Sequence, residues 1–367
     1  MKIVIFGLTI SSSWGNGHAT LWRGLCKHLT RLGHTVVFYE RDVPYYAGAR
    51  DFIELPDGQL QLFSSWEETR LLARSDVRDA DVAIVTSYCP DAIAATDLIM
   101  SEGRAVPVFY DLDTPITLAR MKAGESVPYI GHRGLQDFAL VLSFTGGPCL
   151  AHEFRNRLGA RDIRPLYGHV DSDIHRPVPP QPHYRADLSY LGTYSEDRQH
   201  GLEALFVKPA RARQDLRFLI GGAQYPDDFP WSPNIYFVRH LPPPEHAPFF
   251  ASSRLTLNVT RKAMAAMGWC PSGRLFEAAA CGVPLMSDDW PGIQDFFTPG
   301  REILIARDTQ DALTALAMSS ADLQSIARCA YERTMDQHTS DKRARELVSL
   351  LEQAASSGAH RQQAEEA

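Results

Sequence analysis

The chain has 367 residues, of which 44% are hydrophobic and 22% are charged, and its formal net charge at pH 7 is −7. This composition excludes a disordered or fibrous protein. The acidic balance argues against a general nucleic-acid binder, which would carry a basic face. At roughly 150 residues per domain, the length predicts about two domains.

Targeting and redox signals favour a cytoplasmic protein. The six cysteines form no Cys-x-x-Cys pair, so we expect reduced thiols and neither a disulfide framework nor a zinc site. The N-terminal apolar run is too short for a signal peptide and predicts a first β-strand. No run approaches the roughly 18 to 20 apolar residues that a membrane-spanning helix needs.

In the first half of the chain, short aliphatic runs alternate with longer amphipathic segments. This alternation is typical of βαβ units around a parallel sheet. Predicted strands span 2–8, 35–40, 82–87, 105–110, 139–144 and 163–168. Apolar residues at helical spacing predict helices over 19–32, 90–102 and 147–159.

A proline-rich segment over 169–187 separates this half from a second α/β half. Strands are then predicted over 187–192, 216–221, 234–238, 254–258, 283–287 and 302–306. Helices are predicted over 197–208, 245–252, 273–281, 309–317 and 321–335. The predicted organisation is a first domain over 1–172, a linker over 173–186, a second domain over 187–340, and a C-terminal helix and tail over 341–367. The polar tail from residue 356 is expected to fray.

Open parallel sheets bind ligands at the carboxyl ends of their strands, so the loops there carry the candidate site. After the first strand, Gly15, Gly17 and His18 precede a helix, whose amide groups and positive end favour an anion. Thr20 breaks the Gly-x-Gly-x-x-Gly pattern of dinucleotide binding. A structural explanation is also open, in which Gly15 and Gly17 permit a tight turn and His18 caps the helix. For His18, a functional role is slightly favoured over this structural one.

Two acidic residues follow the strand predicted over 105–110. Asp113 stands where Thr114 begins a helix, which suits a cap residue. An Asp-x-Asp pair also suits a divalent metal, but no third ligand stands nearby, so we expect none. Binding of substrate hydroxyls is the favoured role for Asp111.

The second half places cations at strand ends and helix starts. The candidates there are Thr193, Tyr194 and Arg198, then Asn258 and Arg261, then Arg274 and Glu277. Arginine forks and helix N-termini both match phosphate oxygens, so the group predicts a diphosphate site. Any one of these arginines could simply be a solvated charge on the surface. That explanation accounts less well for three arginines at strand ends and helix starts.

Arg274 and Glu277 share one face of a short predicted helix that begins near Ser272 and stops before Pro284. A surface ion pair would be worth at most about 1 kcal/mol. The alanines and the cysteine that follow predict a buried helix instead, whose charges need a partner. A nucleotide sugar offers phosphates to Arg274 and ribose hydroxyls to Glu277.

One stretch of the second half, together with four others, resembles a known family. Residues 274–306 read RLFEAAACGVPLMSDDWPGIQDFFTPGREILIA, and the supporting stretches are SSSWGNGHA, YDLDTPIT, SYLGTYSEDRQ and LNVTRKAMAAMGWCPSGRLFEAAACG. These resemble GT-B glycosyltransferases of the group 1 type, in the branch of spore-maturation-protein-like glycosyltransferases. The resemblance covers about residues 2 to 340.

The resemblance implies an α/β protein of GT-B architecture, with two Rossmann-like domains facing each other across a cleft and no required metal or cofactor. It implies that Glu277 holds the donor ribose, that Arg261 and Arg274 contact the diphosphate, and that amides around Gly292 contact the donor. The glutamate that the family carries eight positions earlier is replaced by Trp269.

The sequence therefore predicts a glycosyltransferase that moves a sugar from a nucleoside diphosphate, with UDP favoured, to an unidentified hydroxyl acceptor. The resemblance alone implies that the transfer retains the configuration of the sugar. His18, Asp111, Arg261 and Arg274 are the enzyme's predicted catalytic residues. Two alternatives stay open: a nucleotide-sugar 2-epimerase, which needs no acceptor, and a non-catalytic protein that binds sugar nucleotides.

Overall fold

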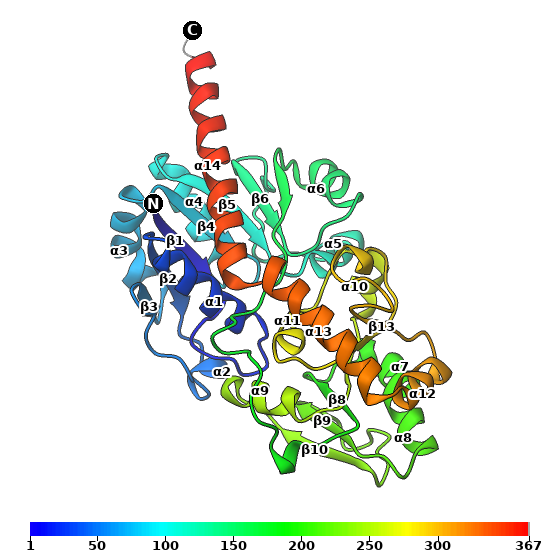
Figure 1. Ribbon diagram of the computed structural model, residues 1–367. Helices are drawn as coiled ribbons and strands as arrows, with labels where there is room; N and C mark the ends of the chain where they lie inside the picture. Colours follow the sequence, from blue (N-terminus) through cyan, green and yellow to red (C-terminus); the bar gives the residue numbers. More distant parts are fainter. Residues whose placement is uncertain (366–367) are drawn as a thin grey trace. The chain divides into compact units, whose positions relative to one another are not determined.

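The computed structural model describes residues 1–365, with side chains described to residue 357. It divides into two compact α/β units, each of which is built around its own sheet (Figure 1). The first unit comprises Met1–Tyr167 and the C-terminal segment from Ser340, and the second comprises Gly168–Thr339. The C-terminal helix, which the sequence assigned to neither domain, is thus part of the first unit.

The first unit contains a seven-stranded sheet in the order β3-β2-β1-β4-β5-β6-β7, and its paired strands run parallel. The strands are β1 (Lys2–Gly7), β2 (Thr35–Arg41), β3 (Gln59–Phe63), β4 (Val82–Thr86), β5 (Val106–Asp111), β6 (Leu140–Ser143) and β7 (Ile163–Pro165). The six strands predicted in this half are confirmed, and the edge strand β3 was not predicted.

Helices connect and cover these strands. They are α1 (His18–Arg31), α2 (Pro44–Ala47), α3 (Trp66–Arg78), α4 (Ala92–Glu102), α5 (Thr114–Lys122), α6 (Leu150–Leu158) and α14 (Ser340–Glu365). The first helix lies beside α14, and α3 packs against α4 (Figure 1). The tail expected to fray from residue 356 is helical as far as Glu365, so that expectation is wrong for this stretch. Residues 366 and 367 lie outside the described part.

The second unit contains a six-stranded parallel sheet in the order β10-β9-β8-β11-β12-β13. Its strands are β8 (Leu188–Leu191), β9 (Phe218–Gly222), β10 (Ile235–Arg239), β11 (Thr256–Asn258), β12 (Leu285–Ser287) and β13 (Leu304–Ile305), which confirms the six predicted strands. Longer helices are α9 (Pro243–Ala251), α10 (Lys262–Met267), α11 (Gly273–Ala280), α12 (Thr309–Ala317) and α13 (Ser320–Gln337).

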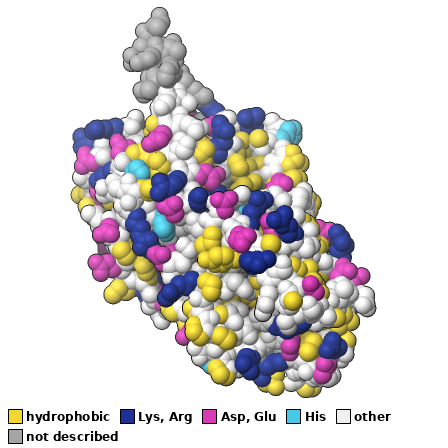
Figure 2. Space-filling model, in the orientation of Figure 1, with side chains coloured by type: hydrophobic (Ala, Val, Ile, Leu, Met, Phe, Trp, Pro, Cys, Tyr) yellow, Lys and Arg dark blue, Asp and Glu magenta, His cyan; other side chains and the backbone are white. Residues whose placement is uncertain are grey.

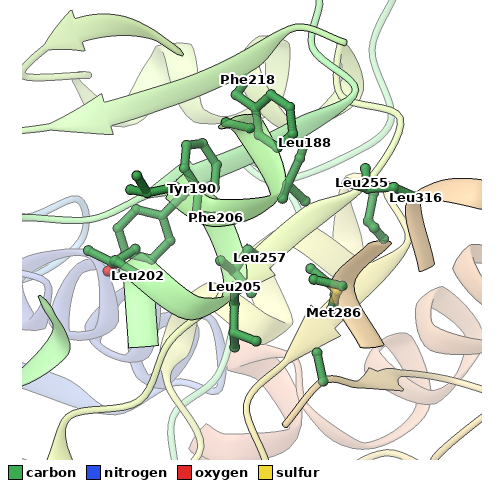
Figure 3. Packing of buried hydrophobic residues seen from close by; sticks show 14 of the residues in the cluster. Leu188, Tyr190, Leu202, Leu205, Phe206, Phe218, Leu255, Leu257, Met286 and Leu316 are labelled. Atoms are coloured by element: carbon green, nitrogen blue, oxygen red, sulfur yellow. The ribbon is translucent and has the colours of Figure 1, made fainter. Parts of the chain in front are cut away.

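The helix predicted over 197–208 is a chain of short turns. It comprises η2 (Glu196–Arg198), α7 (Gln199–Leu202), the π-helical η3 (Glu203–Val207) and α8 (Lys208–Ala212). This irregular segment still buries its apolar side chains against the sheet. Leu205 and Phe206 from η3 pack with Leu188, Tyr190 and Leu257 of the central strands in one core (Figure 3). The hydrophobic core of the unit therefore includes side chains of β8 and β11, two of its central strands.

Charge on the surface is mixed. On the face shown in Figure 2, basic and acidic side chains are interspersed and do not form a continuous basic stripe. None of the helices in the described part of the chain combines the length and the apolarity that crossing a bilayer requires.

One glycine in the second sheet lets two backbone segments approach closely. Gly222 ends β9, and a Cβ atom there would overlap the carbonyl oxygen of Gly192. We expect Gly222→Ala to lower the free energy of unfolding by roughly 1–3 kcal/mol, because the backbone must shift. Urea denaturation measures this, with Gly131→Ala as the control, since no atom lies within 4 Å of that Cβ position. Equal effects of the two changes would contradict the explanation.

Candidate functional site

The helix α11 presents two charged side chains at its start and buries the rest. Ser272, in an extended conformation, precedes the first turn, and Gly282 with a φ of 74° follows the last residue in the left-handed region. Leu275, Phe276 and the three alanines are buried. The predicted bounds of this helix and its buried face are confirmed. Arg274 and Glu277 are not among its buried residues and lie on the more open side of the helix.

Arg274 lies at the carboxyl ends of β8 and β11. Its Nη1 donates to Oδ1 of Asn258 at 3.0 Å, and its guanidinium lies 5.1 Å from the centre of the Tyr190 ring. Burial lowers the pKa of Arg274, since low polarity disfavours the charged form. Gly192 leaves room for this arrangement, because a Cβ there would come within 2.7 Å of Nη2 and 2.9 Å of the Tyr190 hydroxyl.

A second arginine shares this region. Nη1 of Arg198 donates to the carbonyl oxygen of Thr193 at 3.3 Å, and the charge of Arg198 also contributes to the lowered pKa of Arg274. Among the described residues, neither guanidinium forms an ion pair with a carboxylate. Nε of Arg198 and the hydroxyl of Tyr190 are buried there without a hydrogen-bond partner. Two repelling cations with unused donors form a site that suits an anion.

The third predicted arginine is already paired. Nε of Arg261 lies 3.0 Å from Oδ2 of Asp197, and Oδ1 of the same carboxylate accepts a hydrogen bond from the Ser195 hydroxyl. Burial alone would raise the pKa of Asp197, but these two hydrogen bonds and the arginine charges hold it below its usual value. Arg261 therefore adds less uncompensated positive charge than Arg198 and Arg274 do.

Asn258 and Tyr194 have internal partners. The buried Asn258 amide donates to Oγ1 of Thr260 at 3.2 Å and to Oγ of Ser287 at 3.0 Å, while its oxygen accepts from Arg274. The ring of Tyr194 packs against Tyr225 and Phe229. Asn258 thus orients Arg274 through its amide oxygen, and its direct contact with the donor stays a prediction.

Glu277 lies beside two histidines that the sequence did not single out. Its Oε1 is 3.9 Å from Nε2 of His175, whose side chain is buried. Nε2 of His246 lies 3.2 Å from the carbonyl oxygen of Leu241, and burial lowers the pKa of His246 to about 4, so this imidazole is neutral at pH 7. His175 stands in the predicted linker and His246 on α9, and neither belongs to a motif that would have identified it.

Trp269 and Gly292 belong to two different segments that pack against each other. The indole Nε1 donates to Oδ2 of Asp295 at 2.6 Å, and Trp269 has a φ of 44°, which is uncommon for a bulky residue. A Cβ on Gly292 would lie 2.5 Å from the indole ring. Trp269 therefore covers the Gly292 backbone.

In the first unit, three predicted site residues lie in or next to the loop that connects β1 to α1. Gly15 has a φ of 61°, Gly17 is the N-cap of α1, and the backbone N–H of His18 donates to Oδ1 of Asn16 at 3.1 Å. The sequence missed the residue that anchors this loop, the buried Glu40 at the end of β2. Its carboxylate accepts hydrogen bonds from Thr9 Oγ1, Ile10 N, Ser11 N and Ser11 Oγ.

Asp111 ends β5 and is fully buried. Its Oδ1 accepts hydrogen bonds from the backbone N–H of Asp113 and from Oγ1 of Thr117, each at 3.1 Å, while Oδ2 has no partner among the described residues. Burial raises the pKa of Asp111 to about 6. Asp113 is the N-cap of α5, but its carboxylate makes no capping bond and instead accepts from Tyr88 at 2.9 Å.

The predicted site residues thus fall into two sets. Gly15, Gly17, His18 and Asp111 belong to the first unit, and Thr193, Tyr194, Arg198, Asn258, Arg261, Arg274, Glu277 and Gly292 belong to the second. Within the second set, the structure brings Arg198, Asn258 and Arg274 together, and Arg261 joins them through Asp197.

Comparisons with known proteins agree with this architecture. Residues 198–349 match a family model described as glycosyl transferase-like. The structure is similar to sucrose-phosphate synthase from Thermosynechococcus elongatus, with a TM-score of 0.71, 13% identity and coverage of 97% of this chain and 99% of that one. It is also similar to Anabaena HepE solved with UDP-glucose, with a TM-score of 0.68, 12% identity and coverage of 96% and 100%.

A third similar structure is the T4 phage β-glucosyltransferase, with a TM-score of 0.61, 16% identity and coverage of 97% and 99%. No curated protein sequence matches the chain. The structure therefore has the GT-B architecture that the sequence predicted, and part of the second unit matches the glycosyl transferase-like family model. The assignment of the chain to the spore-maturation-like branch stays a prediction.

Proposed function

We propose that the chain transfers a sugar from a UDP-linked donor to a hydroxyl acceptor. The observation that carries this proposal is the pair Arg198 and Arg274 in the second unit, two neighbouring cations that form no ion pair with a carboxylate in the described part of the chain. A diphosphate supplies the missing negative charge, and the planar guanidinium forks match its oxygens. The UDP-glucose complexes of HepE and of the phage enzyme support UDP as the nucleotide.

In this proposal catalysis is mainly electrostatic. As the bond between the sugar and the diphosphate breaks, negative charge grows on the leaving phosphate oxygens. Arg198 and Arg274 stabilise that charge from fixed positions, because Asn258 and the backbone at Thr193 already orient their guanidinium groups. These cations take the part that a divalent metal has in other phosphate sites, which supports transfer without a metal.

Glu277 lies one helical turn beyond Arg274 on α11, where its carboxylate can accept hydrogen bonds from the donor's ribose hydroxyls. We assign the acceptor to the first unit, with His18 beside the loop after β1. The burial of Asp111 gives it a part in holding the turn between β5 and α5. Retention of configuration is proposed from the family resemblance, and NMR of the product's anomeric centre tests it.

A thermal-shift panel tests the donor site. We expect UDP and UDP-glucose to raise the melting temperature, and UMP and uridine to do so less, because the arginines recognise the diphosphate. A ligand at 100 times its Kd stabilises the folded state by about 2.7 kcal/mol. The proposed diphosphate site would be wrong if uridine raised the melting temperature as much as UDP does. It would also be wrong if none of these compounds raised the melting temperature. Product analysis without an acceptor separates transfer from epimerisation of the donor.

A further inference from the structure

A pair of histidines links Glu277 to the loop that follows β10. His246 lies on α9, and its Nε2 is 3.2 Å from the carbonyl oxygen of Leu241. Nε2 of His175 is 3.4 Å from Nδ1 of His246 and 3.9 Å from Oε1 of Glu277. Three segments that are distant in sequence therefore meet at two imidazole rings.

The protons on these rings follow from their partners. A carbonyl oxygen only accepts, so Nε2 of His246 carries the proton and its Nδ1 is a lone pair. Nε2 of His175 is then the donor to that lone pair, and the same nitrogen lies 3.9 Å from Oε1 of Glu277. This leaves Nδ1 of His175 as a bare lone pair, and it is the ring atom that has no partner among the described residues.

A bound cation would explain the cluster less well. The ligand atoms of His175, His246 and Glu277 lie within 4.8 Å of one another, and ligands of a tetrahedral zinc lie about 3.3–3.4 Å apart. If Nε2 of His175 bound a metal, its proton would move to Nδ1. That N–H would be buried without an acceptor, whereas metal-binding histidines almost always donate their other N–H to a carboxylate, carbonyl or water.

We propose that His175 and His246 are positioning residues, which hold the Glu277 carboxylate in the orientation that binds the donor's ribose hydroxyls. The proposal rests on the proposed function, in which Glu277 accepts those hydrogen bonds. The His175 N–H attracts Oε1 and restrains the carboxylate, while His246 fixes His175 through the backbone at Leu241. A side chain that is ordered before binding loses less conformational entropy when the ligand arrives.

The test compares two nucleotides by titration calorimetry: UDP, and 2′,3′-dideoxy-UDP, which lacks the ribose hydroxyls. We expect His175→Leu to weaken UDP binding roughly 5- to 10-fold, which is the effect of losing one pre-ordered side chain, and to leave dideoxy-UDP binding unchanged. His175→Gln places an amide N–H near the position of Nε2 and should restore most of the loss. His200→Leu, at an exposed histidine of the same unit, is the matched control.

Each other outcome has a definite meaning. If His175→Leu weakens both nucleotides equally, or neither, the positioning role is wrong. If the unchanged protein binds both nucleotides equally while it still prefers UDP over uridine, the ribose role of Glu277 fails and the diphosphate site survives. If equilibrium dialysis finds one zinc ion per chain that His246→Ala removes, the cluster is a metal site and the proposal is overturned.

Discussion

Arg274→Met is expected to lower kcat/KM for a working UDP-sugar donor by about 10²–10³-fold, the usual effect of removing one fixed donor to a developing negative charge. Methionine fills a similar volume and carries no charge, so the fold should tolerate it. The change also leaves the buried amide oxygen of Asn258 without its donor, so we expect the free energy of unfolding to fall by about 1–3 kcal/mol while the protein stays folded. Initial-rate kinetics with urea denaturation on the same samples measure both quantities.

Two further variants separate charge from geometry. Arg274→Lys keeps the charge but loses the planar fork, so we expect a kcat/KM between those of the original protein and Arg274→Met. Arg254 supplies the matched control, since its guanidinium donates to the backbone carbonyls of Leu316 and Met318 at the end of α12. Arg254→Met should reduce stability and leave kcat/KM nearly unchanged. An Arg274→Met enzyme with full activity would show that the diphosphate is bound elsewhere.

The strands were predictable because most of them are buried on both faces. Runs such as Val82–Thr86 are continuously apolar or β-branched, and no helix of ordinary amphipathicity reads that way. The edge strand β3 was not predicted, although the alternation in its sequence QLQLF is a strand signal. The run is short, and Leu62 is exposed although it is apolar, so no buried face marks the strand clearly. The helix α3 was missed although its signal was present: Ser65 accepts a hydrogen bond from the backbone N–H of Glu68, and the spacing of the two is a capping box.

Within the site, strand ends identified the arginines but not their partners. Arg198 and Arg274 follow strands β8 and β11, and parallel strands bring their carboxyl ends to one edge, so their proximity follows from topology. The sequence could not show that the amide oxygen of Asn258 accepts a hydrogen bond from Arg274, or that Asp197 forms an ion pair with Arg261. His175 and His246 are 71 positions apart and meet only through tertiary packing, which no local pattern records.

The buried Asp111 should make stability depend on pH in a direction opposite to that of most carboxylates. Its pKa is raised from 3.8 to about 6 in the folded protein, so between these values the folded state binds more protons than the unfolded state. The free energy of unfolding therefore falls as the pH rises through this window, by about 3 kcal/mol in total. Asp111→Asn cannot titrate, so we expect its stability to gain by that amount relative to the original protein between about pH 4 and pH 7.

Thr117 gives this prediction a second, independent test. Its hydroxyl donates to Oδ1 of Asp111 and thereby lowers the pKa that burial raises. Removing the hydroxyl in Thr117→Val should raise the pKa further, because the charged carboxylate loses a donor while the neutral acid loses less. The variant should therefore lose more stability at pH 7 than at pH 4, as measured by urea denaturation at both values. Equal losses at the two pH values would mean that Asp111 does not change its charge between pH 4 and pH 7, which would contradict the prediction.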